Sequence, residues 1–139
     1  MGRKAMEKIA SFELTDEQWP YGKRPILALS KTLNEVPSSL TTRSIIILSS
    51  IEHAMQEMAD RSLSHAYVDG GIAINAFISQ QLLEEITITI VPVLIGNGIP
   101  LFRNLTEQVS LSQCRAISYP NGPCQVSYLL NYPSTQEHT

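Results

Sequence analysis

The chain has 139 residues, a mass of 15.4 kDa and a formal net charge of -3, from 10 basic and 13 acidic residues. Its hydrophobic fraction of 43% and mean hydropathy of -0.01 are typical of a globular protein and exclude a disordered chain. The lack of a basic surplus argues against a nucleic-acid partner, and the apolar runs are too short for a membrane span. No charged and apolar leader opens the chain, so we expect one cytoplasmic domain over residues 1–139.

The two cysteines, Cys114 and Cys124, flank Asn121-Gly122, a dipeptide typical of a tight hairpin turn. In such a hairpin Cys124 pairs near Tyr119 and Cys114 lies several residues further along, which is poor geometry for a disulfide. We therefore expect free thiols, in keeping with a reducing compartment. The three histidines are scattered along the chain, so we expect no metal site.

Hydrophobic spacing predicts an ordered series of helices and strands. Met6, Ile9 and Ala10 recur at helical spacing, and a later run of isoleucines is typical of a strand covered on both faces. The spacing of Ser49 and Glu52 is that of a capping box, which predicts the start of a helix. The predicted elements of this half are a helix over 2–12, strands over 25–29 and 44–48, a helix over 51–61 and a strand over 65–68.

The second half begins with a helix after a glycine pair, where Ile74, Phe77 and Ile78 form one apolar stripe. Alternating isoleucine and threonine then predicts a strand, and Asn-Gly between two alternating runs is the strongest short-range signal for a hairpin. The predicted elements are a helix to about residue 83, a strand over 85–93, a glycine-rich loop over 94–102, hairpin strands over 109–118 and 125–132, and a frayed polar tail after Tyr132.

This element order predicts the fold class. Strand, helix, strand, helix and strand in the middle of the chain favour parallel crossover connections, and the closing hairpin adds an antiparallel edge. We find no internal repeat and no second domain in the sequence. The predicted architecture is α/β with a mixed sheet.

The glycine pair in Val68-Asp69-Gly70-Gly71-Ile72 lies between a predicted strand and a predicted helix. A helix N-terminus offers unpaired N–H groups and a partial positive charge, and glycines let an anion approach the backbone. One interpretation is a cradle for a phosphate or pyrophosphate. The other is a tight turn that needs positive φ at one glycine. The segment lacks the full G-x-G-x-x-G fingerprint, so its sequence leaves both open.

Arg3 and Lys4 open the first predicted helix, where acidic residues are normally preferred. They are explained either as a grip on a phosphate or as a solvated charged end. Ser30-Lys31 places a hydroxyl beside a cation at the end of a strand, which suits a nucleotide 2′-phosphate. Because no acidic ribose clamp follows the glycine pair, a bound dinucleotide is expected to be NADP rather than NAD.

Other polar features carry weaker signals. Gly96-Asn97-Gly98 fits a loop that ends a strand, and β propensity alone explains Thr87 and Thr89. Glu84-Glu85 fits the solvated end of a helix better than a catalytic carboxylate pair. No Ser–His–Asp order stands out, so nothing indicates hydrolysis.

Several stretches of the sequence, in this order, resemble the dihydrofolate reductase superfold and, more closely, the reductase family related to the C-terminal domain of RibD, the deaminase-reductase of riboflavin biosynthesis. The resemblance covers nearly the whole chain. The matching stretches are Met1-Gly2-Arg3-Lys4 with Glu7, Trp19-Pro20-Tyr21-Gly22, Leu29-Ser30-Lys31, Tyr67-Val68-Asp69-Gly70-Gly71, Glu85-Ile86-Thr87-Ile88-Thr89, Pro92-Val93-Leu94-Ile95-Gly96-Asn97-Gly98-Ile99-Pro100-Leu101-Phe102 and Asn121-Gly122.

The resemblance implies binding roles for eleven residues and assigns no catalytic residue. It places the cofactor phosphates at the start of the first helix, the adenosine 2′-phosphate after the first strand, and the pyrophosphate at the glycine turn. Thr89 matches the strand position that supports the pterin in dihydrofolate reductases. The implied cofactor-binding residues are Gly2, Arg3, Lys4, Leu29, Ser30, Lys31, Gly70, Gly71, Ile72 and Ala73, and the implied substrate-binding residue is Thr89.

The implied reaction is hydride transfer from NADPH to a C=N-type bond in a pterin or in a ribosylamino-pyrimidine such as 5-amino-6-(5-phosphoribosylamino)uracil. The protein would align the donor with the acceptor and exclude water, while the cofactor supplies the hydride. We also expect a small-molecule substrate and a homodimer. The alternative is a non-catalytic nucleotide-binding or assembly module that has kept the cofactor half of the fold.

The family pattern begins before the Met-Gly-Arg-Lys motif, with two interior strands and a substrate-side segment. We therefore expect an N-terminally truncated form of the fold. Loss of interior strands leaves buried backbone groups unpaired, at roughly 1–3 kcal/mol each, against a total stability of about 5–15 kcal/mol. We expect this chain to lack normal turnover, or to recover strand pairing by self-association through open sheet edges. A third reading is an α/β domain that binds no cofactor and whose cations are solvated.

Overall fold

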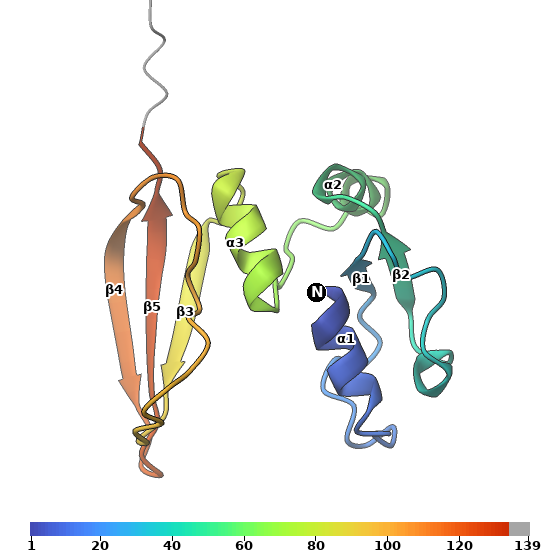
Figure 1. Ribbon diagram of the computed structural model, residues 1–139, viewed down its shortest axis with the longest axis horizontal. Helices are drawn as coiled ribbons and strands as arrows, with labels where there is room; N and C mark the ends of the chain where they lie inside the picture. Colours follow the sequence, from blue (N-terminus) through green and yellow to red (C-terminus); the bar gives the residue numbers. More distant parts are fainter. Residues whose placement is uncertain (134–139) are drawn as a thin grey trace, which may run out of the picture. The chain divides into compact units, whose positions relative to one another are not determined.

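The computed structural model describes residues 1–133, which fall into two compact units divided after Ile74 (Figure 1). The first unit has a parallel strand pair with helices, and the second has an antiparallel sheet. In chain order the elements are α1 (Arg3–Ala10), β1 (Ile26–Leu29), the short 3-10 helix η1 (Ser38–Leu40), β2 (Ile45–Leu48), α2 (Ile51–Asp60), α3 (Gly71–Ser79), β3 (Glu85–Ile90), β4 (Ser110–Ser118) and β5 (Cys124–Asn131).

The core of the first unit forms where α1 packs on β1. Met6 of α1 is fully buried, which confirms the apolar spacing predicted for this helix. It packs in one cluster with Trp19, Ile26, Ala28 and Leu40. Trp19, which the sequence placed in a loop, therefore anchors the connection between α1 and β1 in the core.

β1 and β2 run parallel and pair from Ile26 with Ile45 to Leu29 with Leu48. Both predicted strands are confirmed, each one residue shorter at its start. A polar connection containing η1 joins them, and α2 packs against both strands. All four residues of β2 are half-buried. The parallel pairing brings the carboxyl ends of β1 and β2 side by side.

The start of α2 differs from the predicted capping box by one residue. Ser50, and not Ser49, is the N-cap, and its hydroxyl accepts a hydrogen bond from the His53 N–H (3.2 Å). The Ser49 hydroxyl instead lies 2.9 Å from Nδ1 of His53. From the sequence, either serine of Ser49-Ser50 could be the N-cap. The structure selects Ser50, whose backbone has the extended conformation of an N-cap residue.

The strand predicted over residues 65–68 is wrong, because these residues form no strand pairing. A strand needs a neighbour to complete its ladder of hydrogen bonds. β1 is paired with β2 along one edge, and Gly2 forms a bridge with Leu29 on β1. Residues 65–68 are mostly exposed, with Tyr67 at 92% exposure.

The second unit contains a three-stranded antiparallel sheet in the order β3-β5-β4. The predicted hairpin is confirmed: β4 and β5 pair up to Ser118 and Cys124, and the turn between them has Gly122 at φ +109°. The predicted strand over 85–93 ends at Ile90, close to Pro92, which has no N–H to donate to a ladder. Both cysteines are free thiols.

The two faces of this sheet differ in chemistry, since residues alternate between faces along each strand. Isoleucines of β3 share one face with Val126, Tyr128 and Leu130 of β5, and Ile86 on this face and Ile78 of α3 are both buried. The other face carries Thr87 and Thr89 of β3 with their partners on β5. The alternation predicted from the sequence is therefore confirmed.

Parallel and antiparallel pairings together with helices confirm the predicted α/β fold class. The two kinds of pairing occur in separate sheets, one in each unit. Among residues 1–133, no helix is long and apolar enough to cross a membrane. The prediction of a single domain over 1–139 stays a prediction, and the predicted frayed tail lies, from residue 134 onward, outside the described residues.

Candidate nucleotide-binding site

The start of α1 is built to attract an anion. Gly2 is the N-cap in an extended conformation, and the first turn carries Arg3 and Lys4 with no acidic residue. The first N–H groups of a helix have no partner within the helix and carry partial positive charge. Buried Met6 holds this end of the helix against the core. The predicted cluster of positive charge is therefore present at the start of a helix that is packed against the core.

Gly2 joins the start of α1 to the end of β1. The Leu29 N–H donates to the Met1 carbonyl (2.8 Å), and Gly2 and Leu29 form a parallel bridge. The Met1 ammonium donates to the Leu27 carbonyl (2.6 Å), and burial lowers the pKa of this ammonium. Residues 2–4 thus lie beside the end of β1, where Ser30 and Lys31 follow.

The glycine turn approaches the same point. Gly70 has φ +95°, and a Cβ added to it would lie 3.6 Å from Ala5 Cβ and 3.7 Å from the Gly2 nitrogen. The Ile74 N–H donates to the Gly70 carbonyl (2.9 Å), so α3 begins directly after this contact. The structure therefore brings three predicted segments, the start of α1, the end of β1 and the glycine turn, together around Gly2.

Asp69 supplies a negative charge at this junction that sequence reasoning did not assign. Its carboxylate raises the pKa of the Met1 ammonium, opposing the larger effect of burial. It also adds to the effect of burial in raising the pKa of Tyr21. Its position directly before a glycine pair that opens a helix was the available signal for Asp69.

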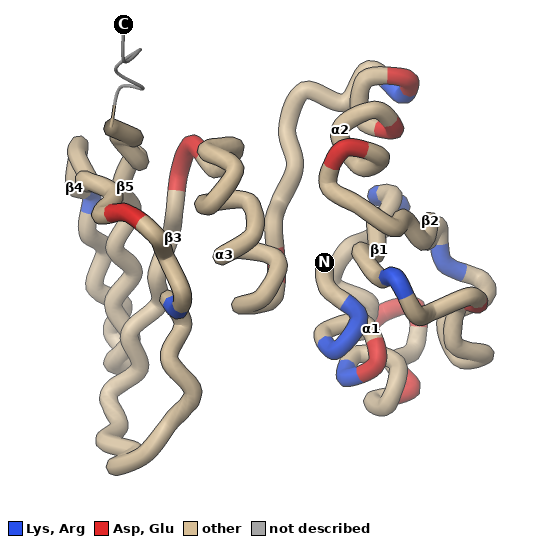
Figure 2. The backbone as a smooth tube through the Cα atoms, turned by 45° about the horizontal axis from the view of Figure 1, so that its top comes forward, with Lys and Arg blue, Asp and Glu red and all other residues tan. Residues whose placement is uncertain are grey.

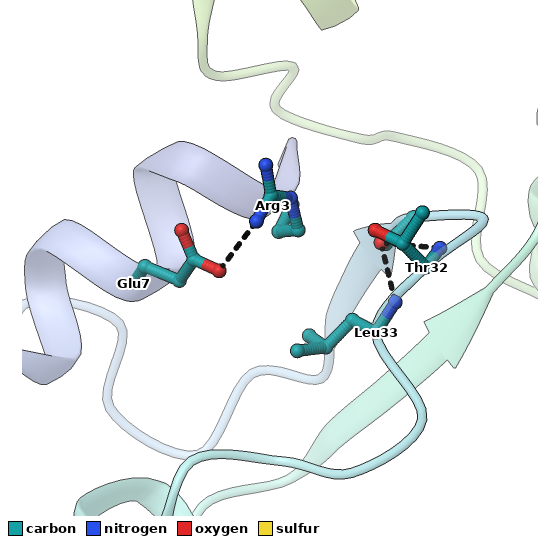
Figure 3. A network of polar contacts seen from close by, with 5 residues as sticks. Arg3, Glu7, Thr32 and Leu33 are labelled. Carbon is teal, nitrogen blue, oxygen red and sulfur yellow. Dashed lines mark hydrogen bonds and ion pairs between the residues drawn. The ribbon is translucent and has the colours of Figure 1, made fainter.

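The end of β1 folds into a tight polar turn. The Ser30 N–H donates to the Leu48 carbonyl (2.9 Å) at the end of β2. The Ser30 hydroxyl oxygen accepts the N–H groups of Thr32 (3.2 Å) and Leu33 (3.0 Å), drawn in Figure 3. Because this oxygen acts as the acceptor, its proton is available to an anion beside the exposed Lys31.

Pairing of β1 with β2 also brings the start of α2 to this edge. Ser49, predicted only as part of a capping box, and His53, one of the three scattered histidines, follow the end of β2. Lys31 contributes to lowering the pKa of Glu52, after hydrogen bonds from the Glu52 N–H and Ser50. Ser49 and His53 are therefore additional polar residues near the end of β1. The signal that could have found them is the Ser-Ser dipeptide directly after a strand.

The cations at this junction differ in their ion pairs. Figure 2 colours the Lys and Arg positions along the backbone, and Figure 3 draws the pair of Arg3 with Glu7. Arg3 forms an ion pair with Glu7 at 3.0 Å, and both side chains are exposed. An exposed pair of this spacing contributes only about 0.3–0.5 kcal/mol, so Arg3 can exchange partners at small cost. Neither Lys4 nor Lys31 takes part in an ion pair with another residue of the described chain.

Two further predicted cofactor residues lie in the first turn of α3. Ile72 is exposed and Ala73 is buried. Both residues place a backbone N–H at the start of α3. Because the Ala73 side chain is buried, Ala73 could contact a ligand only through its backbone. Within residues 1–133, no group of histidine, cysteine and carboxylate side chains is arranged to hold a metal ion.

Thr89, the predicted substrate-binding residue, belongs to the second unit. It lies on the polar face of β3, opposite Gln125 of β5. The Gln125 side-chain amide donates to the Thr89 hydroxyl oxygen (3.2 Å), and the Tyr119 hydroxyl donates to the Gln125 Oε1 (2.8 Å). Thr89 is therefore one end of a short hydrogen-bonded series that the sequence did not reveal.

The second unit also contains a cavity of about 480 Å³ beside the apolar face of its sheet. Its wall is mostly apolar and carries one carboxylate, Glu107. None of the predicted site residues lines it. Apolar residues in the wall include Ile78, Ile86, Phe102, Leu105, Leu111 and Leu130.

Comparison with known proteins identifies the family of the chain. Two similar proteins of Bacillus subtilis (strain 168) are the uncharacterized proteins YwjB, 39% identical over 49 residues, and YyaP, 26% identical over 103 residues. The matches cover 34% and 73% of this chain. They cover 28% and 53% of the relatives, so the chain matches at most about half the length of either.

Solved structures show the same fold. A protein of Shewanella sp. PV-4 assigned to riboflavin biosynthesis is 27% identical with a TM-score of 0.82, covering 95% of this chain and 72% of that one. RibD of Acinetobacter baumannii aligns with a TM-score of 0.60 at 12% identity, over 86% of this chain and 40% of its own. The model of the RibD C-terminal domain matches residues 15–124. The chain therefore belongs to the RibD C-terminal domain family.

Proposed function

We propose that this chain is a cytoplasmic NADPH-dependent reductase that transfers hydride to a C=N-type bond of a pterin or a ribosylamino-pyrimidine. The observation that carries the proposal is the meeting of three segments around Gly2, which gathers Arg3, Lys4 and Lys31 in a chain of net negative charge. Membership of the RibD C-terminal domain family supports the same reaction class. A pyrimidine reductase-like protein of Corynebacterium diphtheriae shares the fold at 17% identity and a TM-score of 0.55.

The residues around Gly2 fit the phosphates of a dinucleotide. A Cβ added to Gly70 would lie 3.7 Å from the Gly2 nitrogen, so glycine at this position brings the turn close to the start of α1. The start of α1 offers N–H groups and the Arg3 and Lys4 cations to an anion. Among the opposing charges, Glu7 pairs with Arg3, and Asp69 acts on the Met1 ammonium and Tyr21.

NADPH supplies the hydride when bound, and the chain supplies binding and orientation. Ser30 and Lys31 would hold the 2′-phosphate through the hydroxyl proton and the ammonium. Gly70, Gly71 and the first turn of α1 would hold the pyrophosphate. Thr89 would hydrogen-bond the acceptor. Alignment of two bound reactants supplies much of the rate enhancement in such transfers.

Substitution of Lys31 by alanine tests the assignment. Removal of one charged contact costs about 1.5–3 kcal/mol, so Lys31→Ala should weaken NADPH binding by about 10- to 100-fold. NADH lacks the 2′-phosphate, and its affinity should not change. Lys8→Ala is the matched control, because Lys8 lies in the last turn of the same α1 and stacks on the Phe12 ring (5.2 Å). Titration calorimetry with both nucleotides measures these affinities.

Turnover separates the reductase from a nucleotide-binding module. NADPH oxidation that depends on dihydrofolate or on 5-amino-6-(5-phosphoribosylamino)uracil would support the reductase. Binding of NADPH without oxidation by either acceptor would overturn it in favour of the non-catalytic module. Equal, weak binding of NADPH and NADH that Lys31→Ala leaves unchanged would overturn both.

We further propose that the chain works as a homodimer. The support is the exposed apolar surface of the second unit, where the segment from Ile86 to Phe102 carries no charged residue. Leu94 and Ile99 in this segment are almost fully exposed. Monomeric proteins rarely leave such a contiguous apolar surface in water.

A further inference from the structure

The polar face of the sheet in the second unit carries two cross-strand pairs of side chains, and the two pairs differ in which group donates the hydrogen bond. Thr87 pairs with Ser127, with 2.7 Å between their hydroxyl oxygens, and either group can donate. Thr89 pairs with Gln125, and here the amide of Gln125 donates to the threonine oxygen at 3.2 Å. Only the second pair fixes which group donates, so that the Thr89 oxygen is the acceptor.

The direction in the second pair is fixed by Tyr119. Its hydroxyl donates to the Gln125 Oε1 at 2.8 Å, which turns the amide nitrogen toward Thr89. The side-chain amide of Gln125 accepts through its oxygen and donates through its nitrogen. Because the Tyr119 hydroxyl occupies the amide oxygen, the amide nitrogen is left to donate to Thr89. The Thr89 oxygen is consequently an acceptor, and its proton is free for another acceptor.

Tyr119 is itself held in place by the hairpin turn. Its N–H donates to the Pro123 carbonyl (2.9 Å), and its carbonyl accepts the Gly122 N–H (3.0 Å). Thr89 is β-branched, so few χ1 rotamers are open to its hydroxyl. The acceptor role of the Thr89 oxygen is thus set by Gln125 and Tyr119, and hydrogen bonds of the hairpin turn hold Tyr119.

We propose that Gln125 is a positioning residue, held by Tyr119, that makes the Thr89 hydroxyl a hydrogen-bond donor to the substrate. This inference rests on the proposed function, in which Thr89 contacts the acceptor. Pterin and pyrimidine rings present carbonyl oxygens and ring nitrogens as acceptors beside their N–H donors, and a hydroxyl that donates pairs with the acceptors. Loss of the donor at position 89 would leave one such acceptor unpaired. Gln125 therefore contributes to substrate specificity without touching the substrate.

Gln125→Glu is the decisive variant, because a carboxylate accepts a hydrogen bond from Thr89 and removes the donor. We expect the Kd of dihydrofolate, measured by calorimetry on the full chain saturated with NADP+, to rise about tenfold at pH 7. Thr89→Val, which deletes the hydroxyl at similar volume, should give the same rise. The double variant should be no worse than either single one, since both remove the same donor.

Ser127→Ala is the matched control on the same face, and it should leave the dihydrofolate Kd unchanged. The NADPH affinity and the midpoint of thermal unfolding should stay the same in all variants, which separates positioning from a structural role. Additive effects in the double variant, or a normal Kd in Gln125→Glu, would overturn the inference. Absence of dihydrofolate binding to the unsubstituted chain would also overturn it. A chain that binds dihydrofolate, responds to Gln125→Glu and yet oxidises no NADPH would instead contradict the reductase proposal alone.

Discussion

Gly70 is the residue at which a local backbone requirement and the candidate site coincide. Its φ of +95° lies in a region that side chains with a Cβ rarely adopt. The neighbours of an added Cβ, Ala5 Cβ and the Gly2 nitrogen, lie at ordinary van der Waals distances. Backbone strain, and not a clash, therefore explains why glycine is needed here. The sequence left a phosphate cradle and a tight turn open, and the structure shows the turn while keeping the cradle available.

Gly70→Ala should destabilise the chain by about 1–3 kcal/mol, the usual cost of a non-glycine residue held at a sparsely populated φ. Urea unfolding measures this change in the free energy of unfolding. Gly2→Ser is the matched control, because Gly2 has φ -80°, nothing lies within 4 Å of an added Cβ, and serine is a preferred N-cap. A Gly70→Ala variant as stable as the unsubstituted chain would contradict the strain argument.

Among the elements, the first turn of α2 makes a contribution to the free energy of unfolding that depends on pH. Glu52 lies in the first turn, and its pKa is lowered below its ordinary value of 4.5, first by its own backbone N–H and then by the Ser50 hydroxyl. The favourable helix dipole acts in the same direction. Because the folded pKa is depressed, the charged carboxylate stabilises the fold above pH 4.5. That stability is lost as the pH falls through the folded pKa.

Glu52→Gln should therefore lower the free energy of unfolding at pH 7, and the difference from the unsubstituted chain should shrink progressively below pH 4.5. Denaturant unfolding between pH 7 and pH 3 measures it. In a Ser50→Ala background the pH-dependent part should be smaller, since one of the hydrogen bonds to the carboxylate is gone. A difference that stays constant across this range would contradict the account.

At the scale of the whole molecule, charge and apolar surface are unevenly distributed along the chain. Eight of the 10 basic residues precede Asn75, and the first unit carries the proposed phosphate contacts. The second unit carries the uncharged segment from Ile86 to Phe102 and the edge strands β3 and β4. Open strand edges and exposed apolar side chains both favour association with another copy.

The homodimer proposal predicts a mass of two chains by sedimentation at micromolar concentration. The double variant Leu94→Asn with Ile99→Asn should shift the chain toward the monomer, because it places amides on the apolar surface. Tyr67→Asn is the control, since Tyr67 is equally exposed but belongs to the first unit. A monomer in the unsubstituted chain, or a dimer that resists the double variant, would count against this surface as the interface.

Most of the helices and strands follow from local patterns in the sequence. Local periodicity located the helices around Met6, Ile51 and Ile74 and the strands of both sheets, and Asn121-Gly122 located the hairpin. These features depend on neighbours within a few residues, which the sequence contains. It also supplied the segments of the candidate site, because glycines and cations at element ends carry a local signal. The predicted strand over residues 65–68 failed because strand formation needs a distant partner.

Which of these segments meet depends on contacts between distant parts of the chain. Gly70 lies against Gly2, and the end of β1 lies beside the end of β2. Gln125 contacts Thr89 because the pairing of β5 with β3 places them opposite each other. Such pairings join residues tens of positions apart, and no local pattern specifies them. Hydrogen bonding and packing between distant segments fix them together when the chain folds. The length, composition and charge of the chain therefore set its class, while the chemistry of its site depends on contacts that only the fold creates.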